Sequence, residues 1–245
     1  VAVRRLRSDL RSFRELVDAQ WSDPLRQELR WLGTELGAVR DLDVFIGRLG
    51  ADATRVGGAD DPGVAALISA AREMRAGMHA RLTATLRSQR YAELRDRLCR
   101  AARAPRFTLA ARLHAEEAIG PVIRRRYKRV RDAVNDLPQR PPLRQLHRVR
   151  IFAKRLRYAS EAAALVAGRD ASHLAERAEA LQEALGELND ADIACATLRR
   201  LRRRPELALP ANALLSLELE AAARARAAWP AVWHALSRKE VRAWL

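Results

Sequence analysis

Apolar side chains recur at helical spacing along nearly the whole chain, and no segment shows the sustained apolar and polar alternation of a β-strand. Helix breakers are few for 245 residues, with 11 Gly and 10 Pro, and they gather in short clusters. Such a chain buries its apolar faces by packing long helices on one another. The sequence therefore predicts an all-α fold, with helices at residues 1–20, 25–49, 62–102, 107–136, 142–167, 171–203 and 211–240.

Three of the predicted breaks have identifiable causes. At residues 21–24 (WSDP), Ser22 or Asp23 can cap a helix and Pro24 suits its first turn. The cluster at 57–62 (GGADDP) closes the first pair of helices and opens the next. Gly168 ends the helix at 142–167.

Two short motifs occur twice, in the same order. Residues 4–7 (RRLR) recur 150 positions later as KRLR, and residues 36–43 (LGAVRDLD) recur 149 positions later as LGELNDAD. Nearly equal offsets predict an internal duplication within one domain, 1–245. We expect two pseudo-symmetric antiparallel helical bundles, 1–103 and 104–245, around a central basic groove. The second copy follows a His-x-x-Arg pair whose first-half match would precede Val1, so we expect the sequence to be trimmed there.

The charge balance predicts a polyanionic partner. Lys and Arg number 46 against 30 Asp and Glu, a formal net charge of +16. Aromatic residues, at 5%, are too few for stacking successive bases, which handicaps single-stranded nucleic acid as the ligand. No glycine-rich phosphate loop is present, which disfavours a mononucleotide site. No run approaches the ~18 apolar residues of a spanning helix, so we expect no membrane insertion.

The densest cationic ribbon lies on the predicted helix 142–167. At about 100° per residue, one arc is apolar and predicted to be buried. Its members are Leu146, Val149, Ala153, Leu156 and Ala163. The opposite arc carries His147, Arg150, Lys154, Arg157 and Tyr158, with Glu161 beside them. We interpret Arg148 and Arg155, which point elsewhere, as solvated charges.

A solvated helix face is the alternative reading of this ribbon. Solvated faces usually interleave both signs of charge, whereas this one is almost purely cationic. Lys154 and Arg157 also recur as Arg4 and Arg7. Because unpaired like charges repel, their repetition favours a compensating anion.

A second basic run, residues 123–131, carries Arg125 and Lys128 outside its predicted buried side. If this helix packs beside 142–167, the two ribbons line one groove; a plain exposed helix is the alternative. Arg supplies planar forks and Lys point charges, so rows of both suit a linear chain of phosphates.

No catalytic or metal-binding constellation is evident in the sequence. Asp41 and Asp43, like Asp190 and Asp192, lie two residues apart, and on a helix such side chains point about 200° apart. We expect Asp41 and Asp190 to orient Arg or His side chains of the groove. No nucleophile and base arrangement is found, so we expect no cofactor, no metal and no enzymatic activity. Cys99 and Cys195 form no C-x-x-C pair, which favours a reducing compartment.

The two copies of RRLR/KRLR and of the Leu-Gly-x-x-x-Asp motif, with His147 and Arg150, resemble the CHAD domain, the conserved histidine α-helical domain. The resemblance covers essentially the whole chain. It implies a central basic channel that binds inorganic polyphosphate, in proteins that can also carry a triphosphate-hydrolase-type domain. It implies polyphosphate contacts for His147, Arg150, Lys154, Arg157, Arg4, Arg7, Arg125 and Lys128, supported by Tyr158, Asp41 and Asp190. Because His147 lies among cations, we expect a neutral ring that donates one hydrogen bond to phosphate rather than a metal ligand.

The predicted function is non-catalytic capture of inorganic polyphosphate. We expect it in the cytoplasm, in association with polyphosphate-containing granules. The alternatives are a nucleic-acid binder that uses the same groove, an accessory module of a phosphate-processing enzyme, and a structural scaffold. The sequence leaves the oligomeric state open.

Overall fold

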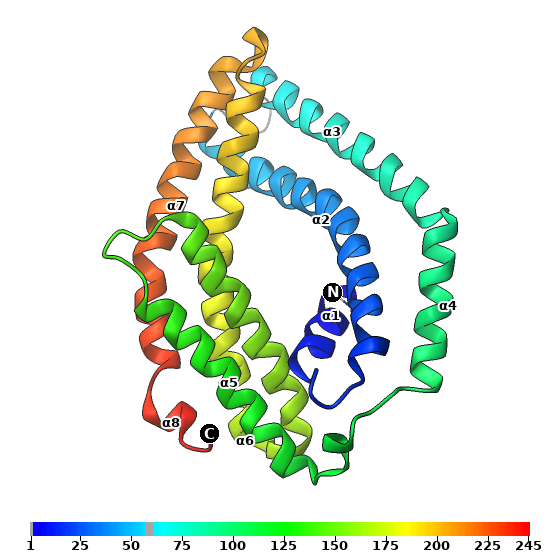
Figure 1. Ribbon diagram of the computed structural model, residues 1–245. Helices are drawn as coiled ribbons and strands as arrows, with labels where there is room; N and C mark the ends of the chain where they lie inside the picture. The colour runs from blue at the N-terminus through cyan, green and yellow to red at the C-terminus, as the bar shows by residue number, and fades with distance from the viewer. Residues whose placement is uncertain (1, 57–60) are drawn as a thin grey trace. The chain divides into compact units, whose positions relative to one another are not determined.

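The computed structural model describes residues 2–56 and 61–245 (Figure 1). Its helices are α1 (Ala2–Ser12), α2 (Ala19–Val56), α3 (Pro62–Leu86), α4 (Gln89–Arg103), α5 (Ala115–Asn135), α6 (Leu143–Leu201), α7 (Ala208–Leu236) and α8 (Lys239–Arg242). Short 3-10 turns cover Leu109–Arg112 and Pro205–Leu207. Over the described ranges, strand-type pairing is limited to one bridge between Val17 and Phe107. The predicted all-α class is confirmed.

The first predicted break was placed wrongly. The chain turns at residues 13–18, and α2 begins at Ala19 because the Asp18 carboxylate accepts a hydrogen bond from the Trp21 backbone N–H at 2.8 Å. Pro24 therefore lies inside α2 rather than at its start. An earlier Asp has taken the capping role that the sequence offered to Ser22 or Asp23.

The helix predicted at 62–102 is two helices. Asp61 caps α3 by accepting from the Val64 N–H at 2.8 Å, with Pro62 in the first turn. The helix stops at Leu86, and Ser88 starts α4: its hydroxyl accepts from the Tyr91 N–H at 3.3 Å. Residues 57–60 of the predicted breaker cluster lie outside the described residues.

The chain divides into two compact units. Unit 1 comprises residues 1–33, 93–186 and 228–245, and unit 2 comprises 34–92 and 187–227. The long helices α2, α6 and α7 each contribute residues to both. The units thus take alternating stretches of sequence, and the division into duplicated halves at 103/104 stays a prediction.

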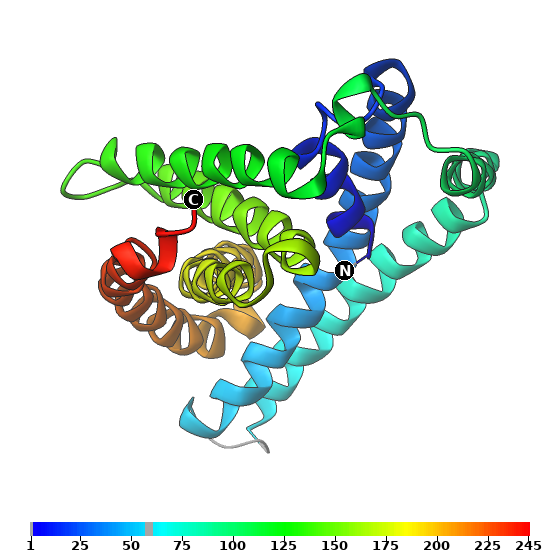
Figure 2. The same cartoon turned by 90° about the horizontal axis from the view of Figure 1, so that it is seen from below.

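Unit 1 is built on the first half of α6. The five residues of its predicted apolar arc are all 1% exposed or less, which confirms the helical register. Helix α5 lies alongside this half of α6 (Figure 2) and buries Ile123 and Val130 completely. Tyr127 of α5 stacks on Trp233 of α7, with ring centroids 6.4 Å apart.

Gly168 reverses the chain inside α6. Its φ of 60° and ψ of −134° are not helical, and Figure 1 shows the stretches on either side of it lying next to each other. Arg157 and Glu179 accordingly meet at 2.7 Å. In a straight helix these residues would be about 33 Å apart, at about 1.5 Å per residue.

Replacing Gly168 with alanine should lower the free energy of unfolding by about 1–3 kcal/mol, because a Cβ makes this left-handed conformation strained. A Cβ at Gly168 would meet nothing within 4 Å, so the penalty is conformational rather than steric. Urea denaturation followed by circular dichroism measures it. Gly47→Ala is the control: Gly47 is exposed inside α2, also in open space, and alanine there should stabilise by about 0.5–1 kcal/mol. Equal effects of the two substitutions on the free energy of unfolding would contradict the claim that the backbone conformation at Gly168 requires glycine.

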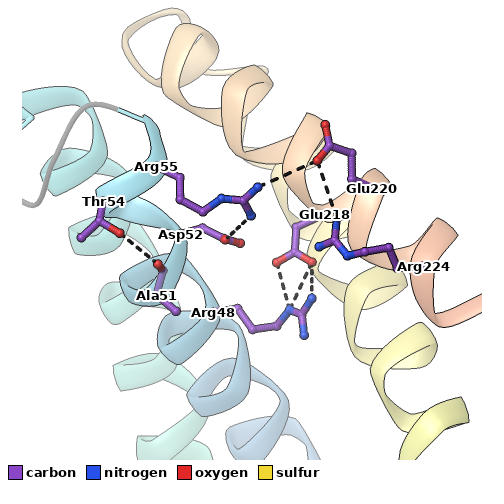
Figure 3. A network of polar contacts seen from close by, with 8 residues as sticks. All are labelled: Arg48, Ala51, Asp52, Thr54, Arg55, Glu218, Glu220 and Arg224. Atoms are coloured by element: carbon purple, nitrogen blue, oxygen red, sulfur yellow. Dashed lines mark hydrogen bonds and ion pairs between the residues drawn. The ribbon is translucent and has the colours of Figure 1, made fainter. Parts of the chain in front are cut away.

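Unit 2 has its own apolar core and a buried ion pair. Phe45 and Leu49 of α2 pack with Leu67 of α3, Leu198 of α6 and Leu214 of α7. Beside this core the Arg48 guanidinium donates to both oxygens of Glu218 at 2.6–3.1 Å (Figure 3). Glu218 is 1% exposed, so Arg48 takes the place of the water that would otherwise solvate this carboxylate.

No helix in the described part of the chain is long and apolar enough to cross a membrane.

Candidate functional site

One cavity in unit 1 concentrates positive charge. It has a volume of about 570 Å³ and lies among α1, the beginning of α2 and the first half of α6. Eight of its twelve lining residues are cationic: Arg4, Arg7, Arg11, Arg26, Arg30, Arg150, Lys154 and Arg155. His147, Ser8, Gln27 and Ile151 complete the lining, and none of these described lining residues is acidic. We call this cavity the cation pocket.

Helical spacing explains why three elements present cations to one space. Arg4, Arg7 and Arg11 are three and four residues apart, so they share one face of α1. Arg26 and Arg30, four residues apart, do the same on α2. Arg26 also pairs with the exposed carboxylate of Asp23, one turn earlier.

Burial and like charge destabilise the positive form of three pocket cations, Arg7, Lys154 and Arg155. Burial, reinforced by Arg150, Arg4 and Arg7, lowers the pKa of Lys154 to about 8. Burial and neighbouring arginines likewise lower the pKa of Arg155 to about 10 and lower that of Arg7. Each shift records that the positive form is destabilised by lost hydration and by like charge. A bound anion would offset both effects by direct attraction.

The pocket also offers a neutral donor. The Ser8 side chain is 9% exposed, and its hydroxyl has no hydrogen-bond partner in the part of the chain that the structure describes. Two glycines lie next to long cations of the pocket, at distances where an added Cβ would make ordinary van der Waals contact. The Cα of Gly186 faces Arg150, whose Nε would lie 3.5 Å from an added Cβ. Gly33 similarly faces Arg7.

Five of the eight residues predicted to contact the anion line this pocket together: Arg4, Arg7, His147, Arg150 and Lys154. Arg157, one turn beyond Lys154, instead makes ion pairs of 2.7 Å with Glu161 and with Glu179. Arg5 joins this cluster through Glu161 at 3.2 Å. The carboxylates already neutralise Arg157, so it is less suited than the pocket cations to hold a polyanion.

The remaining predicted residues lie elsewhere. Tyr158 is buried, with the Arg157 guanidinium 5.7 Å from its ring centre. Arg125 pairs with Glu15 at 2.6 Å, and Lys128 is exposed on α5.

Asp41 and Asp190 both belong to unit 2. Asp41 lies 3.3 Å from Arg40, and Asp190 accepts a hydrogen bond of 3.3 Å from Asn189. That these two carboxylates orient groove cations stays a prediction.

Sequence reasoning missed four cations of the pocket: Arg11, Arg26, Arg30 and Arg155. For Arg155 a signal was present. With His147 at zero on the helical wheel, Arg150 lies at about 300° and Arg155 at about 80°, so a face centred near His147 holds both. Ile151, at about 40°, lies between them and interrupts the run of charge.

Cationic surface continues from the pocket around α6. Arg11 and Arg155 also line a neighbouring cavity of about 440 Å³, together with Arg129 and Arg148. Asp132 and Asp136 line it as well, so its charge is mixed. The guanidinium carbons of Arg148 and Arg155 both lie 5.6 Å from the centre of the Phe152 ring.

Arg126 of α5 lies close to these cavities and is 7% exposed. Its guanidinium donates to the Arg11 carbonyl at 2.6 Å, and burial with nearby arginines lowers its pKa to about 10. It therefore ties α5 to α1 and adds to the crowding of positive charge. Among the described residues, no group of three His, Cys, Asp or Glu is placed to hold a metal ion.

Comparison with known proteins places the chain in a family. PptA from Streptomyces chartreusis is 24% identical, with a TM-score of 0.80, over 95% of this chain and 86% of that one. The CHAD domain from the plant Ricinus communis is also 24% identical, with a TM-score of 0.70, over 96% and 78% of the two chains. At such identity these likenesses show the fold alone. Curated protein sequences give no significant match. The CHAD domain family model matches residues 1–199, most of the chain, and the protein belongs to the CHAD domain family.

Proposed function

We propose that the cation pocket binds inorganic polyphosphate and that the chain does so without catalysing a reaction. The observation that carries this proposal is the crowding of eight Lys and Arg side chains around one cavity of about 570 Å³. Polyphosphate supplies negative charge at every unit and can thread between such cations. Arg forks and the Lys ammonium match its oxygens, as charge-assisted hydrogen bonds require.

The lining favours a bare phosphate chain over a nucleic acid. Base readout needs aromatic planes or several amide side chains, and the pocket offers Gln27 and the single imidazole of His147. The remaining polar groups are cations and the Ser8 hydroxyl, which suit phosphate oxygens of any position along a chain. The expected interaction is therefore repetitive and electrostatic.

The mechanism is capture by a preformed site. The pocket cations are held on three helices, so their mutual repulsion is present before any ligand arrives. A polyanion relieves that repulsion and releases its own counterions, which makes affinity fall steeply with salt. With up to eight contacts, the slope of log K against log salt should be roughly −5 to −6.

A competition assay tests the ligand. Labelled long-chain polyphosphate is bound at fixed moderate salt and challenged with unlabelled polyphosphate, single-stranded RNA, duplex DNA and tripolyphosphate. Preference for long polyphosphate over both nucleic acids at equal phosphate concentration supports the proposal. Equal competition by RNA or DNA would replace it with nucleic-acid binding. Release of orthophosphate from bound polyphosphate, measured with and without Mg²⁺, would contradict a purely binding role.

The affinity for long-chain polyphosphate should fall as the pH rises through about 8. Lys154 has a pKa of about 8 in the free pocket, and a bound polyanion raises it, so binding takes up a proton above pH 8. The loss of affinity should approach about tenfold per pH unit between pH 8 and pH 9.5. Binding isotherms at constant ionic strength measure it.

Lys154→Arg is the control for this pH dependence, because a guanidinium stays protonated across the same range. Its affinity should be nearly flat from pH 7 to 9.5. An equal decline in the wild type and in Lys154→Arg would assign the effect to another group.

A further inference from the structure

A second cavity in unit 1 combines a flat aromatic side chain with three arginines. It has a volume of about 320 Å³ and lies between the first turns of α2 and the end of α4. Trp21, Pro24 and Leu25 line it from α2, and Arg97 and Arg100 line it from α4. Arg106, three residues beyond α4, completes the cationic side. We call this cavity the Trp21 pocket.

The Trp21 pocket is distinct from the cation pocket. The two share no lining residue. On α2, Trp21 and Arg30 are nine residues apart, which at about 100° per residue puts them on opposite faces. The helix thus presents Trp21 to one cavity and Arg30 to the other.

The apolar side of the pocket is formed by Trp21 and its buried neighbours. Trp21 is half-buried, and its backbone N–H is fixed by the Asp18 carboxylate at 2.8 Å. Leu25, one turn later, is 5% exposed, and Ala101 of α4 is 9% exposed. Trp21 thus lines the cavity beside small and apolar neighbours, and an indole in such a setting can stack on a planar group.

The cationic side consists of three exposed arginines. Arg97 and Arg100 lie three residues apart on one face of α4. The Arg106 carbonyl accepts a hydrogen bond of 3.0 Å from the Asp18 N–H, so the backbone at Arg106 is tied to the turn that precedes Trp21. Over residues 2–56 and 61–245, none of the three guanidiniums has an ion-pair partner. Glu93, one turn before Arg97 on α4, is an acidic side chain near the arginines, but it does not line the pocket.

We propose that the Trp21 pocket binds a nucleoside polyphosphate, with the base stacked on Trp21 and the phosphates held by Arg97, Arg100 and Arg106. A cavity of about 320 Å³ falls at the small end of ligand pockets, about 300–1,000 Å³, and suits one nucleotide rather than a strand. The indole accepts any base by its π-face, and the guanidiniums match phosphate oxygens bidentately. Phosphate-loop motifs are absent from the sequence, so the site is assembled from side chains instead. It does not depend on polyphosphate binding in the cation pocket.

Charge alone does not account for this combination. A bare phosphate chain would engage the guanidiniums and leave the indole uncovered. Tripolyphosphate carries at least as much negative charge as ATP, so a purely ionic site would bind tripolyphosphate at least as tightly. Tighter binding of ATP must come from its base.

The experiment uses the full chain with the cation pocket disabled by Arg7→Gln, Lys154→Gln and Arg155→Gln. Calorimetric titration should show ATP binding at least tenfold tighter than tripolyphosphate. Adding Trp21→Leu should weaken ATP at least tenfold and leave tripolyphosphate within twofold, whereas Trp21→Phe should keep most of the ATP affinity. Adding Arg97→Gln with Arg100→Gln should weaken both ligands at least tenfold.

Arg72→Gln with Arg95→Gln is the matched control, because both arginines are exposed, neither lines the Trp21 pocket, and their replacement removes the same charge; Arg95 lies about 160° from Arg97 around α4. It should leave ATP binding within twofold. Equal affinity for ATP and tripolyphosphate, or an unchanged ATP affinity in Trp21→Leu, would overturn the proposal. So would tighter binding of a twelve-nucleotide RNA than of ATP, which would make a strand the occupant. None of these outcomes bears on the polyphosphate assay of the unmodified cation pocket.

Discussion

Replacing Arg7, Lys154 and Arg155 together with glutamine should weaken the binding of long-chain polyphosphate by more than about a hundredfold at moderate salt. Each of these residues lines the cation pocket and has its pKa lowered by burial and by neighbouring cations. A hydrogen bond to a charged group contributes about 1.5–3 kcal/mol, so three such contacts exceed the roughly 2.7 kcal/mol of a hundredfold change. Fluorescence anisotropy of labelled polyphosphate measures the loss.

The control for this variant removes the same charge from elsewhere. Arg72, Arg87 and Arg203 are exposed, and their joint replacement by glutamine should change affinity by less than about threefold, because exposed charges act only through a screened field. The slope of log K against log salt should fall by about 2 for the pocket variant and stay unchanged for the control. Equal losses of affinity in the two variants would mean that polyphosphate responds to the net charge of the protein and not to the cation pocket.

Thermal stability distinguishes a binding site from a scaffold. Glutamine at the three pocket positions relieves repulsion between poorly compensated cations, so the free energy of unfolding should be unchanged or higher. If these residues had a structural role, the same variant would unfold at a lower temperature. Natural retention of repulsive charge is expected where function needs it.

The spacing of apolar and cationic residues along the sequence was enough to predict which face of α6 is buried and which cations share the other face. The wheel over 142–167 identified the buried arc correctly, because burial on one face of a helix depends only on the spacing of apolar residues. It also brought His147, Arg150 and Lys154 to one face, and the repeat with KRLR pointed to Arg4 and Arg7. Gly168 was predicted to end a helix, and its φ of 60° does so.

Partners from distant parts of the chain were beyond local pattern. Arg157 looked like part of the cationic ribbon, yet the reversal at Gly168 brings Glu179 to within 2.7 Å of it. The spacing of residues 157 and 179 does not predict that contact, since a straight helix would separate them. Arg26 and Arg30 were missed for the same reason: their contribution depends on which face of α2 packs against α1.

The predicted start of α2 was wrong because two sets of capping residues compete there. Asp18 and the pair Ser22 and Asp23 are all acceptable capping residues, and Pro24 made the second choice attractive. In the structure the hydrogen bond from the Trp21 N–H to Asp18 starts α2 six residues earlier than predicted. Trp21 therefore lies in the first turn of α2, where it lines a cavity together with residues of α4.

Arg48→Met should destabilise the protein by about 3–5 kcal/mol, the cost of leaving a buried carboxylate without its partner. Glu218 is 1% exposed and receives three hydrogen bonds from Arg48, whose pKa is raised chiefly by that interaction (Figure 3). Glu187, the second carboxylate near Arg48, is exposed and can be rehydrated. Chemical denaturation followed by circular dichroism measures the effect.

The double variant Arg48→Met with Glu218→Leu separates two contributions to stability: the ion pair itself and the cost of leaving one buried charge unpaired. Both positions border an apolar core that contains Leu49 and Leu214, so two apolar side chains can pack there without leaving a charge behind. The double variant should therefore recover most of the stability lost by Arg48→Met alone. Arg55→Met is the matched single control: its carboxylate partners are Asp52 at 3.2 Å and the exposed Glu220 at 3.9 Å, and its loss should cost less than about 1 kcal/mol. Similar destabilisation by Arg48→Met and Arg55→Met would mean that the Glu218 charge is hydrated, and that burial of this pair does not hold unit 2 together.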